Sequence, residues 1–364
     1  MNLSDIAHLR LANQQLVRPA LKTEAAMVGW LGAAQAQDFT GAKWSLGVRL
    51  WPTSDAAIES AFNDGRILRT HVLRPTWHFV TPADARWLLT LTSPRVHVAN
   101  RPMYRTLELD EATLRRAGEV MTGALGGGRA LTRDEVGAAL EQAGVHTSGG
   151  HDRAGQRLAY LMMWAELEGL IISGPRRGKQ FTYMRLDERA PAGPSLDGDE
   201  ALAELAHRYF QSHGPATEPD FARWSGLTLT DSRKAIAGVS PALQREEVAG
   251  QAYWFAAAGP ALRDPSPTAY LLSIYDEYTI GYKDLSAIGG DEHGATLRAM
   301  GNALQNVIIL DSRVVGTWRR VIGRKLLTIH LNFLVPVTDG ERQAVVAAAE
   351  QYGAFLGLAV TVES

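Results

Sequence analysis

The 364-residue chain contains no cysteine. This absence excludes structural disulfides, thiol nucleophiles, iron–sulfur clusters and cysteine-ligated zinc. The chain also lacks a surplus of charge of one sign, because 37 Lys and Arg stand against 39 Asp and Glu, for a net charge of −2. A protein that coats nucleic acid nonspecifically needs many basic contacts. The charge balance therefore disfavours that class. Local basic patches are still compatible with the overall charge balance.

Long apolar runs are missing as well, because no stretch approaches the roughly 18 residues of a membrane-spanning helix. Met1 to Leu11 (MNLSDIAHLRL) has neither the basic start nor the apolar centre of a secretory signal. With 46% hydrophobic and 21% charged residues, the composition is that of a globular protein. At about 100 to 200 residues per domain, the length predicts two to three domains. We expect a folded cytoplasmic protein that does not associate with membranes.

Several catalytic signatures are absent. The sequence has no GxxxxGK[ST], no GxGxxG that opens a helix, no HExxH and no GxSxG, which disfavours nucleotide hydrolysis, dehydrogenation and common serine hydrolysis. The ten histidines show no paired ligand spacing, so no metal and no cofactor are expected. Gly126-Gly127-Gly128 lies between two amphipathic helices with no strand before it and is interpreted as a linker rather than a phosphate loop.

A repeated order of elements is present instead, and it is clearest in the middle of the chain. Thr132 to Glu135 (TRDE) predicts a capping box that opens a helix toward Ala143, and a second apolar helix ends at Gly169. A hairpin follows over residues 170–186, with its turn at 174–178. Helix, turn, helix and β wing is the order of a winged helix.

The first and third parts of the chain follow the same order. In the first part we expect helices over 4–15, 23–34 and 54–62 and strands over 67–73 and 77–81. In the third part we expect a helix over 200–211, two short helices that start after Thr217 and Thr230, and a β pair over 243–256. The last part predicts strands over 307–310, 314–318, 325–333 and 359–363 and a helix over 338–352.

These patterns predict an α+β protein with three tandem winged-helix modules followed by a β-rich α/β unit. The expected boundaries lie near Thr106, Arg189 and Pro260. The segments are therefore a first winged helix over 1–106, a second over 107–189, a third over 190–260 and a C-terminal unit over 261–364.

Gln35-Ala36-Gln37-Asp38 places two long amides where an apolar helix is ending. Residues two apart point about 200° apart on a helix but share a face in extended backbone. Extended geometry would let both amides hold one water molecule, although an amide cannot act as a strong base. The alternative is that Gln35 and Gln37 cap the helix and bond nearby backbone, and the residues alone favour this structural interpretation.

Arg69 to Phe79 (RTHVLRPTWHF) predicts a hairpin with alternating faces. If Thr76 and His78 share a face with His71, that face is polar and titratable, while Trp77 and Phe79 pack on the other. The alternative is a wing with a hydrogen-bonded core histidine.

Basic residues gather in three β turns, and this pattern favours local phosphate contact over a merely solvated surface. The candidate DNA-binding residues are Arg69, Arg74, His78, Arg176, Arg177, Lys179, Arg319, Arg320, Arg324 and Lys325.

The segment YDEYTIGYKD at 275–284 is a dense acidic and aromatic cluster. Tyr275, Tyr278 and Tyr282 fall at helical spacings, which indicates a packing stripe. The carboxylates of Asp276, Glu277 and Asp284 are general acid or base candidates. The packing interpretation is favoured, because the sequence offers them no partner.

Five segments carry a resemblance to a known family: LGAAQAQD at 31–38, LRPTWHFV at 73–80, GPATEPDFARWSGL at 214–227, YDEYTIGYKD at 275–284 and VVGTWRR at 314–320. They resemble the winged-helix DNA-binding proteins that include the DNA glycosylases AlkZ and YcaQ, in the expected order over essentially the whole chain. The resemblance implies a C-shaped arrangement of three winged helices around a DNA-binding concavity. It also implies hydrolytic removal of alkylated purines, with unhooking of interstrand crosslinks in the best-known members.

The resemblance also implies which residues act. The family's catalytic motif is Gln-x-Gln in the AlkZ-like branch and Gln-x-Asp in the YcaQ-like branch, and here Gln35 and Gln37 match the former. Asp38 lies one position beyond and is not the aspartate of the second pattern. The family uses a hairpin for crosslink unhooking, but its motif has no secure counterpart here. Activity on monoadducts is therefore expected ahead of crosslink activity.

We therefore predict a monofunctional DNA glycosylase, a hydrolase of base excision repair that removes N7-alkylated purines from double-stranded DNA. Such a purine is already positively charged, so the remaining task is to position water at the sugar carbon. The motif supplies no lysine for a Schiff base. The alkyl group, base flipping, crosslink unhooking, and self-resistance as opposed to general repair stay open.

The alternative is a noncatalytic winged-helix DNA-binding protein or transcription regulator. A regulator usually reads two half-sites as a dimer, and the sequence has no coiled coil or obvious dimer helix. We expect a monomer that is associated with the nucleoid when it binds DNA.

Overall fold

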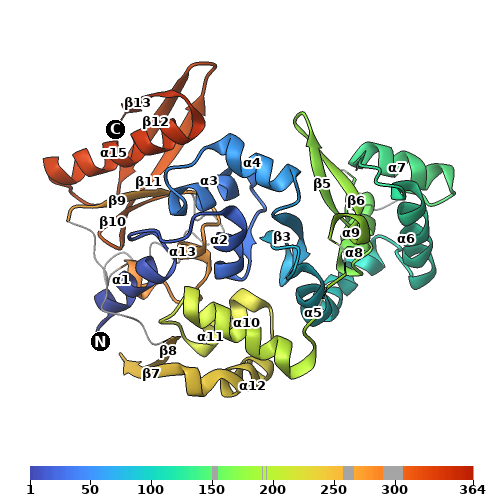
Figure 1. Ribbon diagram of the computed structural model, residues 1–364, viewed down its shortest axis with the longest axis horizontal. Coiled ribbons are helices and arrows are strands. Elements are labelled where there is room, and N and C mark those ends of the chain that lie inside the picture. Colours follow the sequence, from blue (N-terminus) through green and yellow to red (C-terminus); the bar gives the residue numbers. More distant parts are fainter. Residues whose placement is uncertain (150–154, 191, 194, 257–265, 290–305, 364) are drawn as a thin grey trace. The chain divides into compact units, whose positions relative to one another are not determined.

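The computed structural model describes residues 1–149, 155–190, 192–193, 195–256, 266–289 and 306–363. They form a mixed helix and strand protein (Figure 1) that divides into two compact units. The first unit comprises Met1–Glu59, Ala203–Trp224 and Thr228–Ser364, and the second comprises Ser60–Leu202 and Ser225–Leu227. The N-terminal residues thus pack with the C-terminal half. The winged-helix boundaries near Thr106 and Arg189 stay predictions, and the one at Pro260 lies outside the described residues.

The first unit contains a five-stranded sheet with the order β13-β12-β11-β10-β9. Its strands are β9 Ala269–Leu272, β10 Val307–Leu310, β11 Arg313–Ile322, β12 Leu326–Phe333 and β13 Ala359–Glu363. All neighbouring strands are antiparallel except β12 and β13, which are parallel. The helix α15 (Asp339–Leu356) connects these two parallel strands and packs against the sheet. The three C-terminal strands over 307–310, 325–333 and 359–363 are confirmed, while the strand predicted over 314–318 extends to Ile322.

The helix α15 shows how local sequence sets an element's ends. Thr338 accepts from the Glu341 N–H while the Glu341 side chain accepts from the Thr338 N–H, so a capping box starts the helix. Gly357 ends it in the left-handed conformation at φ 69°. The helix buries Tyr352 and Phe355 against Trp44, with ring centroids 4.8 and 5.1 Å away.

The rest of the first unit is mostly helical. Its helices are α1 Leu3–Asn13, α2 Glu24–Leu31, α3 Phe39–Arg49, α11 Glu218–Ser225, α12 Leu229–Val239, η1 Ser240–Ala242 and α13 Glu277–Ile280, with most of α4 Asp55–Asn63 and α10 Gly198–Ser212. The short strand β1 (Ala34–Gln35) lies between α2 and α3. The predicted β pair is confirmed as β7 (Leu243–Val248) and β8 (Gln251–Ala256).

The second unit contains two hairpins and four long helices. The strands are β2 Leu68–Val72, β3 Arg74–Val80, β4 Leu131–Thr132, β5 Ile171–Arg177 and β6 Gln180–Arg185. The helices are α5 Ala85–Thr106, α6 Glu111–Leu125, α7 Arg133–Gln142, α8 Gln156–Leu167 and the short α9 Leu186–Arg189. The capping box at Thr132 is confirmed. The core of this unit is built on buried Leu114, Met121, Leu140, Leu161 and Ile171.

Some predicted elements need correction. The helix from Thr23 ends at Leu31 rather than Ala34, because Gly32 adopts φ 79° and turns the chain. The third-segment helix is capped by Thr228, whose hydroxyl accepts from the Asp231 N–H, and not by Thr230. Among the described residues, no helix is long and apolar enough to cross a membrane.

Candidate active site

The Gln-x-Gln segment is a stretch of non-helical chain between two helices. Gln35 belongs to the strand β1 and is 9% exposed, while Gln37 is exposed. Gly32 ends α2 in close contact with Trp224, whose ring lies 3.4 Å from the position that a Cβ on Gly32 would take. The helix α3 starts at Phe39, directly after Asp38. The structure therefore has extended backbone at Gln35, which is the geometry that lets residues two apart share a face.

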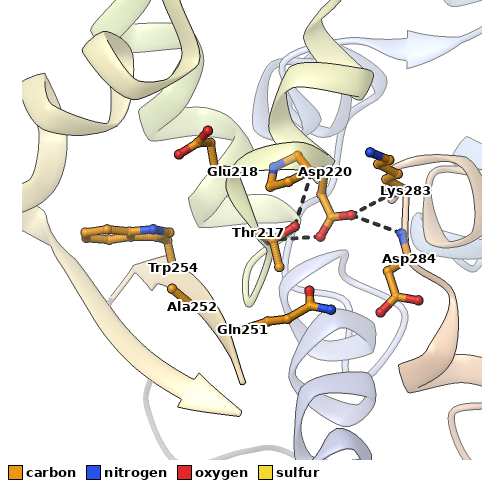
Figure 2. Close-up of a pocket in the computed structure, with 9 residues that line it drawn as sticks. Thr217, Glu218, Asp220, Gln251, Ala252, Trp254, Lys283 and Asp284 are labelled. Atoms are coloured by element: carbon orange, nitrogen blue, oxygen red, sulfur yellow. Dashed lines mark hydrogen bonds between the residues drawn. The ribbon is translucent and has the colours of Figure 1, made fainter. Parts of the chain in front are cut away.

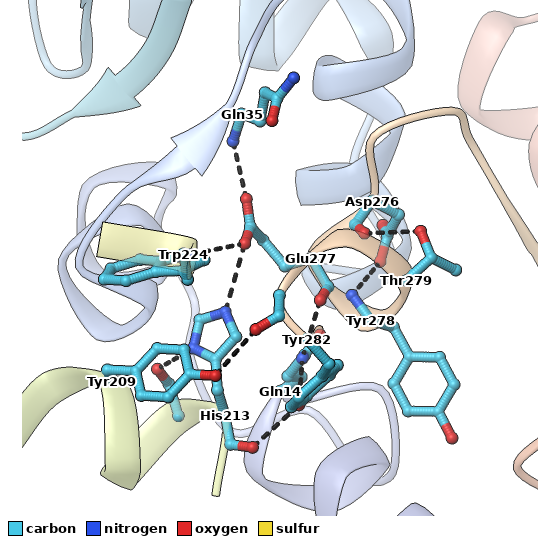
Figure 3. Close-up of polar contacts among 12 residues, drawn as sticks. Gln14, Gln35, Tyr209, His213, Trp224, Asp276, Glu277, Tyr278, Thr279 and Tyr282 are labelled. Atoms are coloured by element: carbon cyan, nitrogen blue, oxygen red, sulfur yellow. Dashed lines mark hydrogen bonds and ion pairs between the residues drawn. The ribbon is translucent and has the colours of Figure 1, made fainter. Parts of the chain in front are cut away.

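A buried carboxylate holds the main chain of this segment. The Glu277 Oε1 accepts a hydrogen bond from the backbone N–H of Gln35 at 2.8 Å. Its Oε2 accepts from the Trp224 Nε1–H at 2.9 Å and lies 3.3 Å from the His213 Nε2. Figure 3 shows these contacts converging on Glu277, with the Gln35 side chain pointing away from the carboxylate. Glu277 comes from α13 and is completely buried.

His213 completes the surroundings of that carboxylate. Its ring stacks on Tyr209, with centroids 4.8 Å apart and planes 12° apart, and its Nδ1 lies 2.8 Å from the Ser212 hydroxyl. Burial lowers the pKa of His213 below its usual value, against the opposing effect of Glu277. A proton on Nε2 fits the contact with Glu277, because a carboxylate oxygen accepts, while the Ser212 hydroxyl donates to the Arg208 carbonyl at 2.7 Å.

The neighbouring Asp276 is a structural acid. Both of its oxygens accept from the Arg49 guanidinium, each at 2.8 Å, and Oδ2 also accepts from the Ser45 hydroxyl. Burial raises the pKa of Asp276, but the Arg49 charge and the hydrogen bonds outweigh it, so the pKa lies below its usual value. The packing interpretation of this segment is confirmed for Tyr278 and Tyr282, which are fully buried. The helix itself spans only four residues.

Asp38, directly after the motif, faces an arginine of the sheet. Its Oδ2 lies 3.9 Å from the Arg320 Nη2, and Arg320 donates to the Tyr352 hydroxyl at 2.6 Å. The carboxylate lies so close to Gly41 that a Cβ there would be 2.7 Å from Oδ2. Burial raises the pKa of Tyr352 to about 12, so its hydroxyl stays protonated near neutral pH. Arg320 is thus engaged in holding the segment after the motif.

A pocket of about 580 Å³ lies beside α11, and Figure 2 shows its wall. Its lining residues are Thr217, Glu218, Pro219, Asp220, Gln251, Ala252, Trp254, Lys283 and Asp284. The buried Asp220 holds this wall together, because its oxygens accept from the backbone N–H groups of Thr217, Lys283 and Asp284. Neither glutamine of the motif is among the residues that line the pocket. The predicted acid Asp284 therefore belongs to this wall and not to the Gln35 segment.

The three basic turns differ in exposure. Arg69 and His78 are buried, Arg74, Arg176 and Arg320 are half-buried, and Arg177, Lys179, Arg319, Arg324 and Lys325 are exposed. Arg69 packs its guanidinium carbon 4.3 Å from the Trp77 ring centre, and burial lowers its pKa to about 10. Burial, followed by the Arg74 charge, lowers the pKa of His78 well below its usual value. Contact with a phosphate is therefore open mainly to the exposed members.

The prediction that His71 shares a polar face with Thr76 and His78 in the first hairpin is wrong. His71 is opposite Trp77 in the β2–β3 register, and Thr70 is opposite His78. Directly opposite residues of an antiparallel pair share a face, so His71 lies with Trp77 and not with His78. The His71 Nδ1 forms a short contact with the Glu166 carboxylate of α8, and both side chains are buried.

Sequence reasoning did not identify His213 and Trp224 as neighbours of the motif. Glu277 was considered only as one member of an acidic cluster. The Gln35–Glu277 contact joins residues 242 positions apart, which gives it no local pattern. Among the described residues, no group of three or more Asp, Glu or His side chains could hold a metal ion.

Comparison with known proteins identifies relatives of the chain. A family model described as DNA glycosylase AlkZ-like matches residues 28–355. A curated relative from Streptomyces sahachiroi, named interstrand DNA cross-link repair glycosylase, is 25% identical over 349 residues, covering 93% of this chain and 91% of the relative. The solved structure of the Streptomyces sahachiroi DNA glycosylase AlkZ matches with a TM-score of 0.79 at 22% identity, covering 100% of this chain and 99% of that chain, and shows the same fold. Because the family model covers most of its length, the chain belongs to the AlkZ-like family of DNA glycosylases.

Proposed function

We propose that this DNA glycosylase hydrolyses the N-glycosidic bond of N7-alkylated purines in double-stranded DNA, with Gln35 and Gln37 positioning the attacking water. Alkylation at N7 places a positive charge on the purine, so the base can leave without an enzyme acid. What remains is to hold water against a sugar carbon that becomes cation-like, and two amides can do so. The observation that carries the proposal is the extended, anchored backbone at Gln35 in a chain of this family.

DNA is held, in this proposal, by the exposed basic turns. The β11–β12 hairpin ends in a turn where Gly323 N–H donates to the Leu326 carbonyl at 2.9 Å, with Arg324 and Lys325 between them. Val321, Ile322 and Leu326 beside this turn are 59%, 51% and 45% exposed. Exposed apolar side chains next to cations are suited to pack against bases while the cations contact phosphates. The β5–β6 turn contributes Arg177 and Lys179 in the same way.

The proposal also assigns winged-helix modules to the chain and a monomeric state to the enzyme. The order α6, α7, α8, β5 and β6 fits a winged helix, with the β5–β6 hairpin as its wing. We extend this assignment to the first and third segments. The enzyme acts as a monomer, since a glycosylase needs no second half-site.

Crosslink unhooking is a second candidate activity. The Streptomyces sahachiroi relative is named an interstrand DNA cross-link repair glycosylase, and the exposed apolar tip of the β11–β12 hairpin is suited to separating paired bases. We rank excision of monoadducts ahead of crosslink unhooking, because the chemistry of the Gln-x-Gln motif is sufficient to support it.

The test is incubation of the protein with duplex DNA that contains N7-methylguanine. We expect release of the free base and an intact abasic strand that breaks only on later alkali treatment, since a monofunctional enzyme leaves the strand whole. A Gln35→Ala, Gln37→Ala double variant should lose at least about 100-fold in single-turnover rate, as expected when groups that position the reactants are removed.

The matched control is a Gln142→Ala, Gln244→Ala double variant, which removes two exposed glutamines outside the motif and should keep the wild-type rate. No release from any N7-alkyl substrate would refute the proposal. Tight binding to one undamaged sequence without excision would instead favour the noncatalytic regulator.

A further inference from the structure

Glu277 contacts the backbone of Gln35, and the Gln35 side chain points away from the carboxylate (Figure 3). We propose that Glu277 is a positioning residue, which fixes the main chain of Gln35 and thereby aims the catalytic amides. This proposal rests on the proposed function of Gln35 and Gln37. It assigns to the 275–284 segment a role beyond packing.

Main-chain anchoring matters at Gln35 because the residues on either side of it are small and apolar. Ala33, Ala34 and Ala36 are all buried, and α2 has already ended at Leu31. The Gln35 N–H donates at 2.8 Å to a carboxylate, and a hydrogen bond to a charged acceptor is about twice as strong as one between neutral groups. A carboxylate in this place therefore restrains the backbone from which the Gln35 side chain projects.

Both the carboxylate and the backbone carbonyl of Glu277 are held by neighbouring side chains. Trp224 donates to Oε2, His213 faces the same oxygen, and the Glu277 carbonyl accepts from the Gln14 amide at 3.3 Å. The Gln35 and Trp224 N–H groups both donate to the carboxylate oxygens. Among the described residues, no lysine or arginine forms an ion pair with Glu277, whereas the adjacent Asp276 is paired with Arg49.

This difference separates a positioning acid from a structural one. A buried carboxylate is costly unless it is paired or fully hydrogen-bonded, and Asp276 meets this condition through Arg49 within the core. Glu277 instead directs one oxygen to the backbone of the motif and the other to the Trp224 N–H.

The experiment compares Glu277→Gln with the wild type in single-turnover excision of N7-methylguanine. A glutamine has the same shape but one oxygen, so either the Gln35 N–H or the Trp224 N–H faces an NH2 group. We expect the rate constant to fall on the order of 100-fold, since small misplacements of a catalytic group cost that much. The Kd for the DNA should change less than about 2-fold, because no phosphate contact is touched.

Two further readouts separate positioning from mere folding. In protein labelled with ¹⁵N-glutamine, the Gln35 amide proton should shift upfield in Glu277→Gln, because its hydrogen bond to a carboxylate is weakened. The matched control is Glu166→Gln, which changes another buried glutamate that faces a histidine. It should lower thermal stability yet keep the rate within about 3-fold, as expected for a site that holds no reacting group.

A folded Glu277→Gln variant with a rate within about 3-fold of wild type overturns the proposal, since loss of a positioning contact costs more. If that variant does not fold, Trp224→Phe removes one donor to the carboxylate and should lower the rate about 3- to 10-fold, and an unchanged rate overturns the proposal. If the wild type excises no N7-alkylpurine, the proposed function fails by itself. The Gln35 amide resonance of the Glu277→Gln variant then tests the role of Glu277 independently of activity. An unshifted resonance overturns that role.

Discussion

Each compact unit contains a buried glutamate that faces a histidine, and the two pairs are built differently. In the first unit, Glu277 receives two N–H donors besides His213, and one of them is the Gln35 backbone. In the second unit, Glu166 forms a short contact with His71, while its Oε1 has no hydrogen-bond partner. The first pair is one part of an anchored loop. The second pair ties the strand β2 to the helix α8.

The two exposed hairpins differ in a similar way. Arg177 on β5 is engaged by the Glu135 carboxylate and the Ala130 carbonyl, each at 2.7 Å. Arg324 and Lys325 at the β11–β12 turn have no ion pair among the described residues. The first unit thus engages both oxygens of its glutamate but has unpaired cations at its hairpin turn, whereas the second unit has one unpartnered glutamate oxygen and a paired arginine. Mutation of the paired groups should therefore change stability, and mutation of the unpaired cations should change DNA binding.

The largest expected effect is on the free energy of unfolding and comes from Asp276, whose carboxylate is fully paired with Arg49. Asp276→Asn leaves Arg49 buried with a neutral partner, and breaking such a pair costs about 3–5 kcal/mol. Urea unfolding at pH 7 measures this loss. Because the folded pKa of Asp276 is lowered, its contribution is present above the unfolded pKa of about 3.9 and disappears as the pH falls through the folded pKa.

The difference between wild type and Asp276→Asn should therefore persist from pH 7 to pH 5 and shrink at more acidic pH. The exposed Asp64 offers a control, since Asp64→Asn should change the free energy of unfolding by less than about 0.5 kcal/mol. A small loss for Asp276→Asn, equal to that of the control, would contradict the structural role of the Asp276–Arg49 pair.

Double-mutant cycles test the comparison of the two glutamate–histidine pairs directly. Combining Glu166→Gln with His71→Asn should give a coupling energy of about 2–3 kcal/mol, because the two side chains are in close contact and share few other partners. Combining Glu277→Gln with His213→Asn should give less than about 1 kcal/mol, because His213 is 3.3 Å away and Glu277 keeps other donors. Urea unfolding of the wild type, the four single variants and the two double variants supplies the energies. Equal coupling energies would mean that the two glutamate–histidine pairs stabilise the fold to the same extent, which would contradict the comparison.

Acidification below neutral pH should destabilise both units through their buried histidines. Burial lowers the pKa of both His78 and His213, so the unfolded chain binds more protons than the folded one below about pH 6.5. Each histidine contributes stability above that pH and loses at most about 1.4 kcal/mol per pH unit below it. Unfolding free energies at pH 7, 6 and 5 measure the slope, which His78→Asn and His213→Asn should each flatten. An unchanged slope in both variants would assign the pH dependence to other groups.

Local signals account for the parts of the fold that the sequence predicted. The capping box at Thr132 depends on residues three apart, and it is found in the structure. The helix predicted over 338–352 is likewise found, as α15. The Gln-x-Gln motif was located by resemblance. The structure shows that the helix ends early at Gly32 and that Gln35 is extended, while the water-holding role of the two amides stays a prediction.

Long-range contacts account for the parts that were missed. The helix α3 was not predicted, since it buries Lys43 and Arg49, whose partners come from other elements. The helix α5 was not predicted either, because it contains Pro94 and Pro102 in its interior. The register of β2 and β3 is shifted by an irregularity after His71, which no alternation pattern reveals.

The smallest expected effect compares the two hairpins as DNA contacts. An Arg324→Ala, Lys325→Ala double variant removes two unpaired cations, so the slope of log affinity against log salt for DNA should fall by about 1.8, at about 0.9 per phosphate contact. Arg177→Ala should change this slope less, because its guanidinium is already engaged by Glu135. Fluorescence anisotropy of undamaged duplex across a salt series gives both slopes. A larger change for Arg177→Ala would reverse the comparison, and it would move the main phosphate contact from the β11–β12 turn to the wing of the second unit.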